Sequence, residues 1–305
     1  MQAGENMRKA VGLVGCGRWG STHLRTLQRL KTEGIIHRIT VCDVDAKQLL
    51  SLDVDATYPS MKAMLDAESL NSVAIVTPPE THLSLVEQAF DAELPVLVEK
   101  PLSRDDRANQ RFLSALPGNE TMVVGYILRH HPGIQHLLSA EVLMSIGPLR
   151  SVTYIRRTTR SKPKETDPLT TLAVHGLDLV AWSLKAKLLA LEVQEISLED
   201  VAARVQFADG EGRIATVDVA WHATSEVRLF EIEGALGKAS LNFGTGESTV
   251  TIHHAEPART THQADALYRE WRYFLDRIDK GEGHTYPPVE RLSDQSAWLG
   301  LHAAQ

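Results

Sequence analysis

The sequence predicts an α/β protein in two parts. A doubly wound parallel sheet comes first, and an α+β domain with a large, mainly antiparallel open sheet follows it. Three observations lead to this prediction. Strands and helices alternate over the first 125 residues, a glycine-rich turn follows the first strand, and strand-like segments succeed one another after about residue 150. The 305 residues suffice for two domains, which we expect to span residues 1–125 and 126–305.

The first half alternates between short apolar runs and amphipathic stretches. Helices are expected after residue 20, where Leu24, Leu27 and Leu30 share one face, and again over 81–92 and 104–116. Because these helices separate successive strands, the strands should be parallel and covered on both faces. The runs expected to form these strands are 10–14, 35–42, 72–76, 95–99 and 121–125.

After about residue 150, strands follow one another with only turns between them. The alternation of residue types over 201–207 predicts a sheet with one face solvated or covered by another subunit. Apolar residues between Leu267 and Ile278 predict one later helix. We therefore expect an antiparallel sheet with helices on one face. The predicted strands are 151–158, 191–197, 201–208, 213–221, 227–234, 239–243 and 249–254, with turns such as 208–212 and 244–246 between them.

Composition and charge exclude several classes of protein. Lys and Arg total 32 against 39 Asp and Glu, a net charge of −7, which argues against a nucleic-acid partner. No apolar run reaches the ~18–20 residues of a membrane helix, and because residues 1–9 are polar we expect no signal peptide there. Two cysteines, Cys16 and Cys42, form no disulfide framework, and no metal-ligand spacing is present. We expect a cytoplasmic protein without membrane or nucleic-acid partners, with its thiols reduced.

A glycine motif follows the first predicted strand and opens a helix. Gly15 permits the tight turn, Gly17 lets the backbone approach a pyrophosphate, and Gly20 allows close packing of helix and strand. Asp43, at the end of the second strand, is placed to accept hydrogen bonds from the ribose hydroxyls of the adenosine and favours NAD over NADP. The predicted cofactor-binding residues of this region are Gly15, Gly17, Arg18, Trp19, Gly20 and Asp43.

The two cysteines flank this region and leave two interpretations open. Cys16 lies inside the glycine turn and Cys42 ends the neighbouring strand. They could approach one another and respond to redox state. The favoured interpretation is that both are small residues in a crowded turn.

Three further motifs give the chain a family resemblance. They are VTPPETH (76–82), EKPL (99–102) and LAVHGLD (172–178). With the amino-terminal GLVGCGRWG (12–20), they resemble the glucose–fructose oxidoreductase/inositol dehydrogenase (Gfo/Idh/MocA) family from about Lys9 to His302. The resemblance implies a Rossmann domain followed by a domain whose open sheet forms a homodimer or homotetramer interface. It also implies hydride exchange between a nicotinamide and a hydroxyl of a sugar, cyclitol or nucleotide-sugar.

The resemblance also assigns site residues. Lys100 and His175 fall where family members flank the reacting hydroxyl, and the Lys100–Pro101 peptide bond is expected to be cis. A histidine can take the hydroxyl proton near neutral pH, and a lysine cation stabilises alkoxide character, so the residue chemistry agrees. The positions that correspond to the lining of the cofactor cleft are Thr77, Pro78, His82, Glu99 and Lys100.

One position departs from the family pattern. Many members carry an aspartate four residues before the histidine, where this chain has Thr171. Asp178 shares a helix face with His175 and could orient it as a third catalytic residue, or make a capping or interdomain contact instead. Two alternatives to a dehydrogenase therefore stay open. One is a cofactor-binding sensor or regulatory protein, and the other is an enzyme that holds NAD tightly for a transient oxidation.

Basic residues precede the predicted catalytic helix. The segment from Arg156 to Lys164 is rich in Arg and Lys and could hold an anionic substrate, or form a solvated basic loop. Arg129, followed by two histidines, is a second candidate near the expected substrate. The predicted substrate-binding residues are Arg129, Arg156, Arg157, Thr171 and His175.

Overall fold

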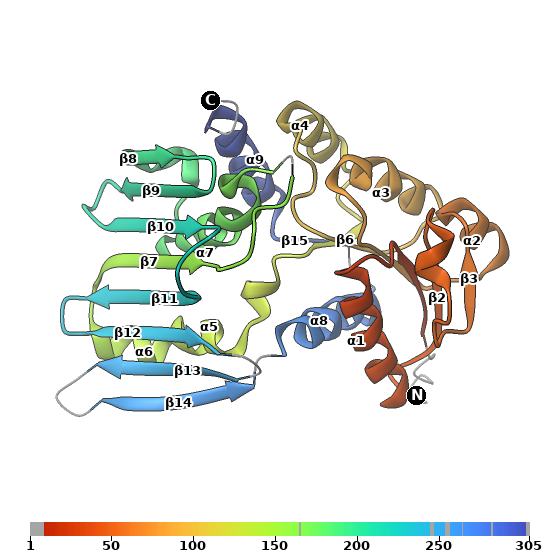
Figure 1. The fold of residues 1–305 in the computed structure, drawn as a ribbon, viewed down its shortest axis with the longest axis horizontal. Helices are drawn as coiled ribbons and strands as arrows, with labels where there is room; N and C mark the ends of the chain where they lie inside the picture. The colour runs from red at the N-terminus through yellow and green to blue at the C-terminus, as the bar shows by residue number, and fades with distance from the viewer. Residues whose placement is uncertain are drawn as a thin grey trace. The chain divides into compact units, whose positions relative to one another are not determined.

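A computed structural model describes residues 9–164, 166–244, 247–253, 257–263, 265–281 and 283–302 (Figure 1). The chain divides into two compact units. The first comprises residues 1–125 and 270–289, and the second comprises residues 126–269 and 290–305. The expectation that all of 126–305 forms one domain therefore fails for 270–289. The physical reason is strand pairing, because His284–Tyr286 adds a parallel strand to the sheet of the first unit.

The sheet of the first unit is entirely parallel. Its strand order is β15-β6-β5-β4-β1-β2-β3, and every neighbouring pair is parallel. The order 3-2-1-4-5-6 within it is that of the doubly wound Rossmann fold and confirms the predicted fold class. Its strands are β1 (Lys9–Val14), β2 (Ile36–Cys42), β3 (Ala56–Tyr58), β4 (Ser72–Ile75), β5 (Val96–Val98), β6 (Thr121–Val124) and β15 (His284–Tyr286).

The helices of the first unit agree with the predicted ones within about two residues. Three elements between β2 and β4 were not predicted: the short helices η1 and α2 and the strand β3. The strand β3 has three residues, none of them fully buried, so its sequence shows no apolar run. The elements are α1 (Gly20–Thr32), η1 (Ala46–Leu49), α2 (Met61–Ala67), η2 (Pro79–Thr81), α3 (His82–Asp91), α4 (Asp106–Ala115) and α8 (Ala266–Lys280), which enters this unit at Glu270.

The second unit is built on a mixed, mainly antiparallel sheet, as predicted. Its order is β14-β13-β12-β11-β7-β10-β9-β8, with β7 and β10 the one parallel pair among these strands. His254 of a predicted strand and residues 245–246 of a predicted turn lie outside the described residues. The strands are β7 (Leu149–Arg157), β8 (Glu192–Leu198), β9 (Ala202–Ala208), β10 (Ile214–Ala220), β11 (Val227–Gly234), β12 (Lys238–Phe243), β13 (Glu247–His253) and β14 (Ala258–Gln263).

Helices cover one face of this sheet. The helices α5, α6 and α7 contact the strands of this sheet. Together with these helices, the inward residues of β7, β9, β10 and β11 form the hydrophobic core. From α9, Trp298 packs on Phe207 with ring centroids 5.4 Å apart. No described helix combines the length and apolar character needed to cross a membrane. The elements are η3 (Ile127–His130), α5 (Pro132–Leu137), α6 (Ala140–Ile146), the π-helical turn η4 (Leu169–Ala173), α7 (Val174–Leu184), η5 (Leu188–Ala190) and α9 (Val289–His302).

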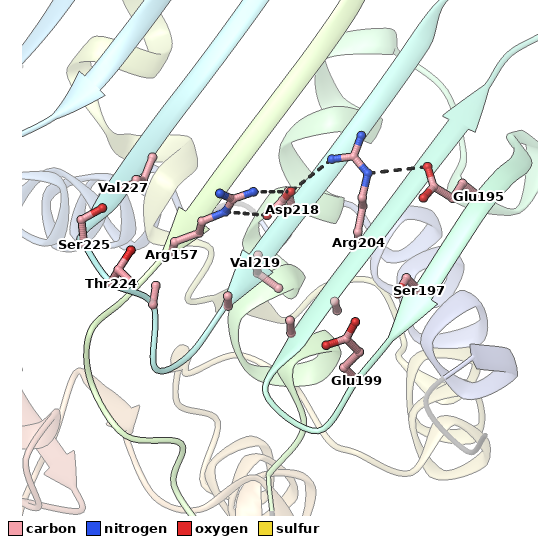
Figure 2. Close-up of a pocket in the computed structure, with 14 residues that line it drawn as sticks. Arg157, Glu195, Ser197, Glu199, Arg204, Asp218, Val219, Thr224, Ser225 and Val227 are labelled. Atoms are coloured by element: carbon pink, nitrogen blue, oxygen red, sulfur yellow. Dashed lines mark hydrogen bonds and ion pairs between the residues drawn. The ribbon is translucent and has the colours of Figure 1, made fainter.

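The opposite face of the sheet carries a chain of ion pairs across neighbouring strands. Figure 2 shows Arg157 of β7 and Arg204 of β9 on either side of Asp218 of β10, in a pocket on this face. The nitrogen–oxygen distances are 2.8 Å from Arg157 and 3.1 Å from Arg204 to Asp218 Oδ2. Arg204 Nε continues the chain to Glu195 of β8 at 3.6 Å. Polar side chains therefore occupy the middle of a sheet face, as the alternating sequence predicted.

Candidate functional site

The glycine turn between β1 and α1 has the shape that a phosphate-binding turn needs. Gly15 has φ +91°, and a Cβ there would lie 2.5 Å from Val76 O. A Cβ on Gly20 would lie 2.2 Å from Gly15 O, whereas one on Gly17 would meet nothing within 4 Å. Two of the glycines are thus required by close packing, and the third leaves open space beside the backbone.

Asp43 holds this turn to the end of β2. Its Oδ2 accepts a hydrogen bond from Cys16 N–H at 2.7 Å, and its Oδ1 accepts one from Asp45 N–H at 2.9 Å. Each carboxylate oxygen retains lone pairs for further hydrogen bonds. The next residue, Val44, is 93% exposed, so an apolar surface lies beside the carboxylate.

Both cysteines are free, buried thiols. Burial raises the pKa of Cys42 to about 12, and the nearby Asp43 adds to this effect. Burial also raises the pKa of Cys16. Because the reactive form of cysteine is the thiolate, these shifts favour the interpretation that both are packing residues rather than a redox pair.

A buried carboxylate, Glu99 at the end of β5, connects several parts of the first unit. Its Oε1 accepts hydrogen bonds from Trp19 Nε1 at 2.6 Å and His23 Nε2 at 3.1 Å. Its Oε2 accepts one from Lys100 N–H at 3.2 Å. A Cβ on Gly125 would come within 2.9 Å of Glu99 Oε1, so a glycine is needed there.

The hydrogen bonds fix the tautomer of His23. Trp271 Nε1, which can only donate, points to His23 Nδ1 at 3.2 Å. The Nδ1 atom must therefore be the acceptor, and the proton sits on Nε2, which donates to Glu99. The resulting chain Trp271–His23–Glu99 joins α8, α1 and β5. Burial alone would raise the pKa of Glu99, but the bonds from His23 and Trp19 and the charge of Lys100 hold it below its usual value.

A second buried carboxyl group, Glu270, lies near this network. It is 0% exposed, and neither of its oxygens has a hydrogen-bond partner among the described residues. Burial and the charge of Glu99 raise the pKa of Glu270 well above its usual value. Its surroundings therefore favour the neutral, protonated form of Glu270 over the carboxylate.

Lys100 follows Glu99 and is half-buried. Burial lowers the pKa of its ammonium group, although the charge of Glu99 opposes this effect. The Lys100–Pro101 peptide bond is cis, as the resemblance implied. His82 lies against this turn, with its ring nitrogens 3.0 Å from Pro101 O and 2.8 Å from Thr77 O. His82 thus connects the VTPPETH and EKPL motifs. Pro78, which follows Thr77 in the first of these motifs, is exposed.

In the second unit, His175 lies in the first turn of α7. It is half-buried, whereas its neighbours over 172–174 and 176–180 are buried. A histidine whose role was only core packing would share their burial, so its accessibility favours a functional role. A π-helical turn, common at functional sites, precedes it. In that turn Thr171 donates its hydroxyl proton to Asp167 O, which leaves the hydroxyl oxygen as an acceptor only.

Asp178 forms a buried ion pair with Arg129. The Arg129 Nη2 to Asp178 Oδ1 distance is 2.6 Å, and Nε to Oδ2 is 2.8 Å. The two side chains are only 4% and 7% exposed. Arg129 also lies over the ring of Trp182, 5.1 Å from its centroid. Both groups expected at the substrate therefore bind one another, and they fix α7 against η3.

Arg156 and Arg157 point to opposite faces of β7, because successive strand residues alternate. Arg156 lies on the helix-covered face and binds Glu226, with Nη1 to Oε2 at 2.9 Å. Arg157 lies on the open face and binds Asp218. One phosphate group cannot contact both, so a joint role for this sequence pair does not fit the fold.

Sequence reasoning missed His23, Trp271 and Glu270. His23 has a weak sequence signal, since it stands three residues after the last glycine of the motif. Trp271 and Glu270 have no such sequence signal, because more than 240 residues separate them from the glycine turn.

Replacing Arg129 with Met should destabilise the second unit by about 3–5 kcal/mol, because Asp178 would stay buried without its counter-charge. The double variant with Asp178→Leu removes both charges and should recover much of this loss. Urea unfolding followed by tryptophan fluorescence measures both. A double variant no more stable than the single one would show that the pair itself is not the cause.

The two buried carboxyl groups should respond oppositely to substitution. Glu99→Gln removes charge-assisted hydrogen bonds and should lower the unfolding temperature by roughly 5–10 °C. Glu270→Met removes a buried polar group that has no hydrogen-bond partner among the described residues, and it should raise the unfolding temperature.

The pH dependence gives a second measurement for Glu270. The pKa of Glu270 is raised on folding, so its stabilising contribution is complete below its unfolded pKa of about 4.5 and falls as pH rises toward the folded value. The advantage of Glu270→Met in thermal unfolding should therefore grow between pH 5 and 8. A variant less stable than the parent across this range would contradict the raised pKa of Glu270.

Comparisons with known proteins agree with this geometry. Residues 9–126 match the family model described as an oxidoreductase family with an NAD-binding Rossmann fold. Inositol 2-dehydrogenase 1 of Saccharopolyspora erythraea is 28% identical over 97% of this chain and 91% of its own length. UDP-N-acetylglucosamine 3-dehydrogenase of Acidithiobacillus ferrooxidans is 29% identical over 57% of this chain and 55% of its own.

A solved structure shows the same fold over nearly the whole chain. The 3-ketoreductase KijD10 of Actinomadura kijaniata, in complex with NADP and TDP-benzene, superposes with a TM-score of 0.81 at 18% identity, covering 97% of each chain. Residues 9–126 thus resemble the Gfo/Idh/MocA oxidoreductase family with its NAD-binding Rossmann fold.

Proposed function

We propose that the protein transfers a hydride between a nicotinamide cofactor and a hydroxyl carbon of a sugar, cyclitol or nucleotide-sugar. The observation that carries this proposal is the Glu99 carboxylate. It binds Trp19 of the glycine turn and the backbone of Lys100 at once. The predicted cofactor-binding turn and the predicted catalytic lysine are therefore held by one group.

The residues of the first unit fit a dinucleotide. The open space at Gly17 and the amino terminus of α1 suit a pyrophosphate, and Asp43 retains acceptor capacity for ribose hydroxyls. Asp43 and the nearby Asp45 would repel a 2′-phosphate, which supports NAD over NADP. When bound, the cofactor supplies the hydride acceptor. Supporting contacts are proposed from Arg18, Thr77, Pro78, His82 and Glu99.

Lys100 and His175 are the proposed proton-handling residues. The lowered pKa of Lys100 makes its neutral form more accessible, and in its charged form it can stabilise an alkoxide. His175 is half-buried on a helix that is otherwise enclosed around it. Asp178 is proposed as a positioning residue, because its contact with Arg129 holds the helix that carries His175. Thr171, with its hydroxyl as an acceptor, is proposed to contact substrate.

The substrate class rests on the relatives. They are named inositol 2-dehydrogenases and a UDP-N-acetylglucosamine 3-dehydrogenase, and the neighbouring structure is a 3-ketoreductase with a TDP ligand. All of these names concern secondary hydroxyl or keto groups of rings, which supports a polyhydroxylated ring as substrate here.

Purified protein should bind NAD(H) more tightly than NADPH in calorimetric titrations. One class among inositols, sugars and nucleotide-sugars should reduce NAD, as measured by the absorbance of the NADH formed.

Lys100→Met and His175→Asn should each lower kcat/KM at least about 100-fold.

Two results would favour the alternatives. A protein that binds cofactor, but reduces it with no substrate and binds it equally well after Lys100→Met, would be a sensor or regulatory protein. The uncharged Thr171 is the reason for considering this alternative. Cofactor that never exchanges during turnover would indicate transient oxidation.

We also propose that the open face of the second unit's sheet forms a homodimer or homotetramer interface. The support is the alternation that directs Thr153, Arg157 and Glu231 to this face, where the described residues place no covering helix. Sedimentation should give a multiple of the 33.7 kDa chain mass. Thr153→Arg, in the middle of the face, should shift it toward the monomer by blocking close packing. A monomeric parent protein at micromolar concentration would refute this interface.

A further inference from the structure

Two arginines face each other directly across neighbouring strands of the second unit. Arg228 of β11 is the register partner of Arg156 of β7. Both side chains lie on the helix-covered face, since they alternate with outward Arg157 and Leu229 (Figure 1 shows β7 beside β11). Cross-strand side chains start about 4.5–5.5 Å apart at Cβ, and like charges there repel.

Among the described residues, Glu226 is the one carboxylate that forms an ion pair with either arginine, and its partner is Arg156. Glu226 Oε2 accepts from Arg156 Nη1 at 2.9 Å, while its Oε1 accepts from Thr158 Oγ1 and Thr159 N–H at 2.6 and 2.8 Å. These bonds lower the pKa of Glu226 to about 2, so it is fully ionised. In the described part of the chain, Arg228 takes part in no ion pair within 4.0 Å.

Arg156 has unused donors although it is almost enclosed. Its side chain is 10% exposed, and its bond to Glu226 is the one hydrogen bond that its guanidinium makes to the described residues. A guanidinium carries five N–H donors. Arg228 stays accessible to solvent, and partial burial together with the charge of Arg156 lowers its pKa. The pair therefore offers several N–H donors and an excess of positive charge.

The arginine pair lies close to the turn of α7 that carries His175. Gly176 packs directly on Tyr154 of β7, because a Cβ on Gly176 would be 2.4 Å from Tyr154 Cδ1. Tyr154 precedes Arg156 by two residues on the same strand face, a distance of about 7 Å. The charges of both arginines act on the Tyr154 hydroxyl and oppose the effect of burial on its pKa.

A buried histidine, His131, lies within the electrostatic reach of Arg228. The charge of Arg228 acts on His131 and, with burial as the largest cause, lowers the pKa of His131 to about 4. His131 is therefore neutral at physiological pH and adds no charge.

We propose that Arg156 and Arg228 bind a phosphoryl group of the substrate, so that the protein acts on a phosphorylated sugar or a nucleoside diphosphate-sugar rather than on a neutral cyclitol. Two guanidinium groups side by side match the paired oxygens of a phosphate or diphosphate. The proposal deepens the proposed function and rests on it for the identity of the substrate, but anion binding itself requires no turnover.

The test measures anion binding to the full-length protein by calorimetry, with pyrophosphate, UDP and glucose 1-phosphate as probes. The parent protein should bind at least one of them with micromolar to millimolar affinity that weakens with salt. Arg228→Gln should weaken it about tenfold or more. The matched control is Arg150→Gln, which removes an exposed arginine from the same face at the other end of β7 and should leave binding unchanged. Tight UDP binding with weak glucose 1-phosphate binding would identify a nucleoside diphosphate-sugar, and the reverse a sugar phosphate.

Thermal unfolding separates loss of the site from loss of the fold. Arg228→Gln relieves the repulsion with Arg156, so its unfolding temperature without anion should equal or exceed that of the parent protein. Pyrophosphate should raise the unfolding temperature of the parent but not of the variant. Equal anion affinity in the parent and Arg228→Gln, or no anion binding by the parent, would overturn the inference. Neither of those results affects the proposed function, whose failure would instead appear as absent NAD binding or turnover.

Discussion

The buried carboxylate of Glu99 is the constraint on which the first unit depends. A charge this far from water is tolerated only with compensating hydrogen bonds, and here they come from Trp19, His23 and the backbone of Lys100. Each donor belongs to a different element, so satisfying one charge fixes the glycine turn, α1 and the EKP turn relative to one another. The same requirement explains why Gly125 has no side chain and why α8, entering from a distant part of the sequence, places Trp271 against His23.

The second unit is organised by the two-residue period of its strands. Along β7, Val152 and Tyr154 enter the core under α7, and Arg156 continues this row. Arg157 belongs to the other row and joins Asp218 on the open face. The helix itself is held by the ion pair of Arg129 and Asp178, which costs desolvation but leaves α7 one orientation against η3.

Sequence patterns predicted those features that depend on neighbours along the chain. Apolar runs and the glycine turn predicted the parallel sheet, and alternation predicted the second sheet with its helix-covered face. The three-residue strands β3 and β15 were not predicted. Each is a strand because it pairs with an existing sheet edge, and its own composition does not indicate a strand. The contact between Asp178 and Arg129 could not be predicted for a related reason. Their positions in the sequence are compatible with a catalytic role. The two residues are 49 positions apart in the sequence, and only the fold shows that they are in contact.

Local conflicts within a consistent fold indicate where selection has acted on something other than stability. Most charges in the second unit have partners, as in the chain from Arg157 to Glu195 on the open face. Arg228 departs from this pattern, because it has no ion pair among the described residues and faces Arg156 across the strand pair, where like charges repel. A single substitution of Arg228 by Gln or Thr would remove this repulsion between the two arginines. A repulsive pair beside the turn that carries His175 is therefore best explained by an anion that neutralises it when bound.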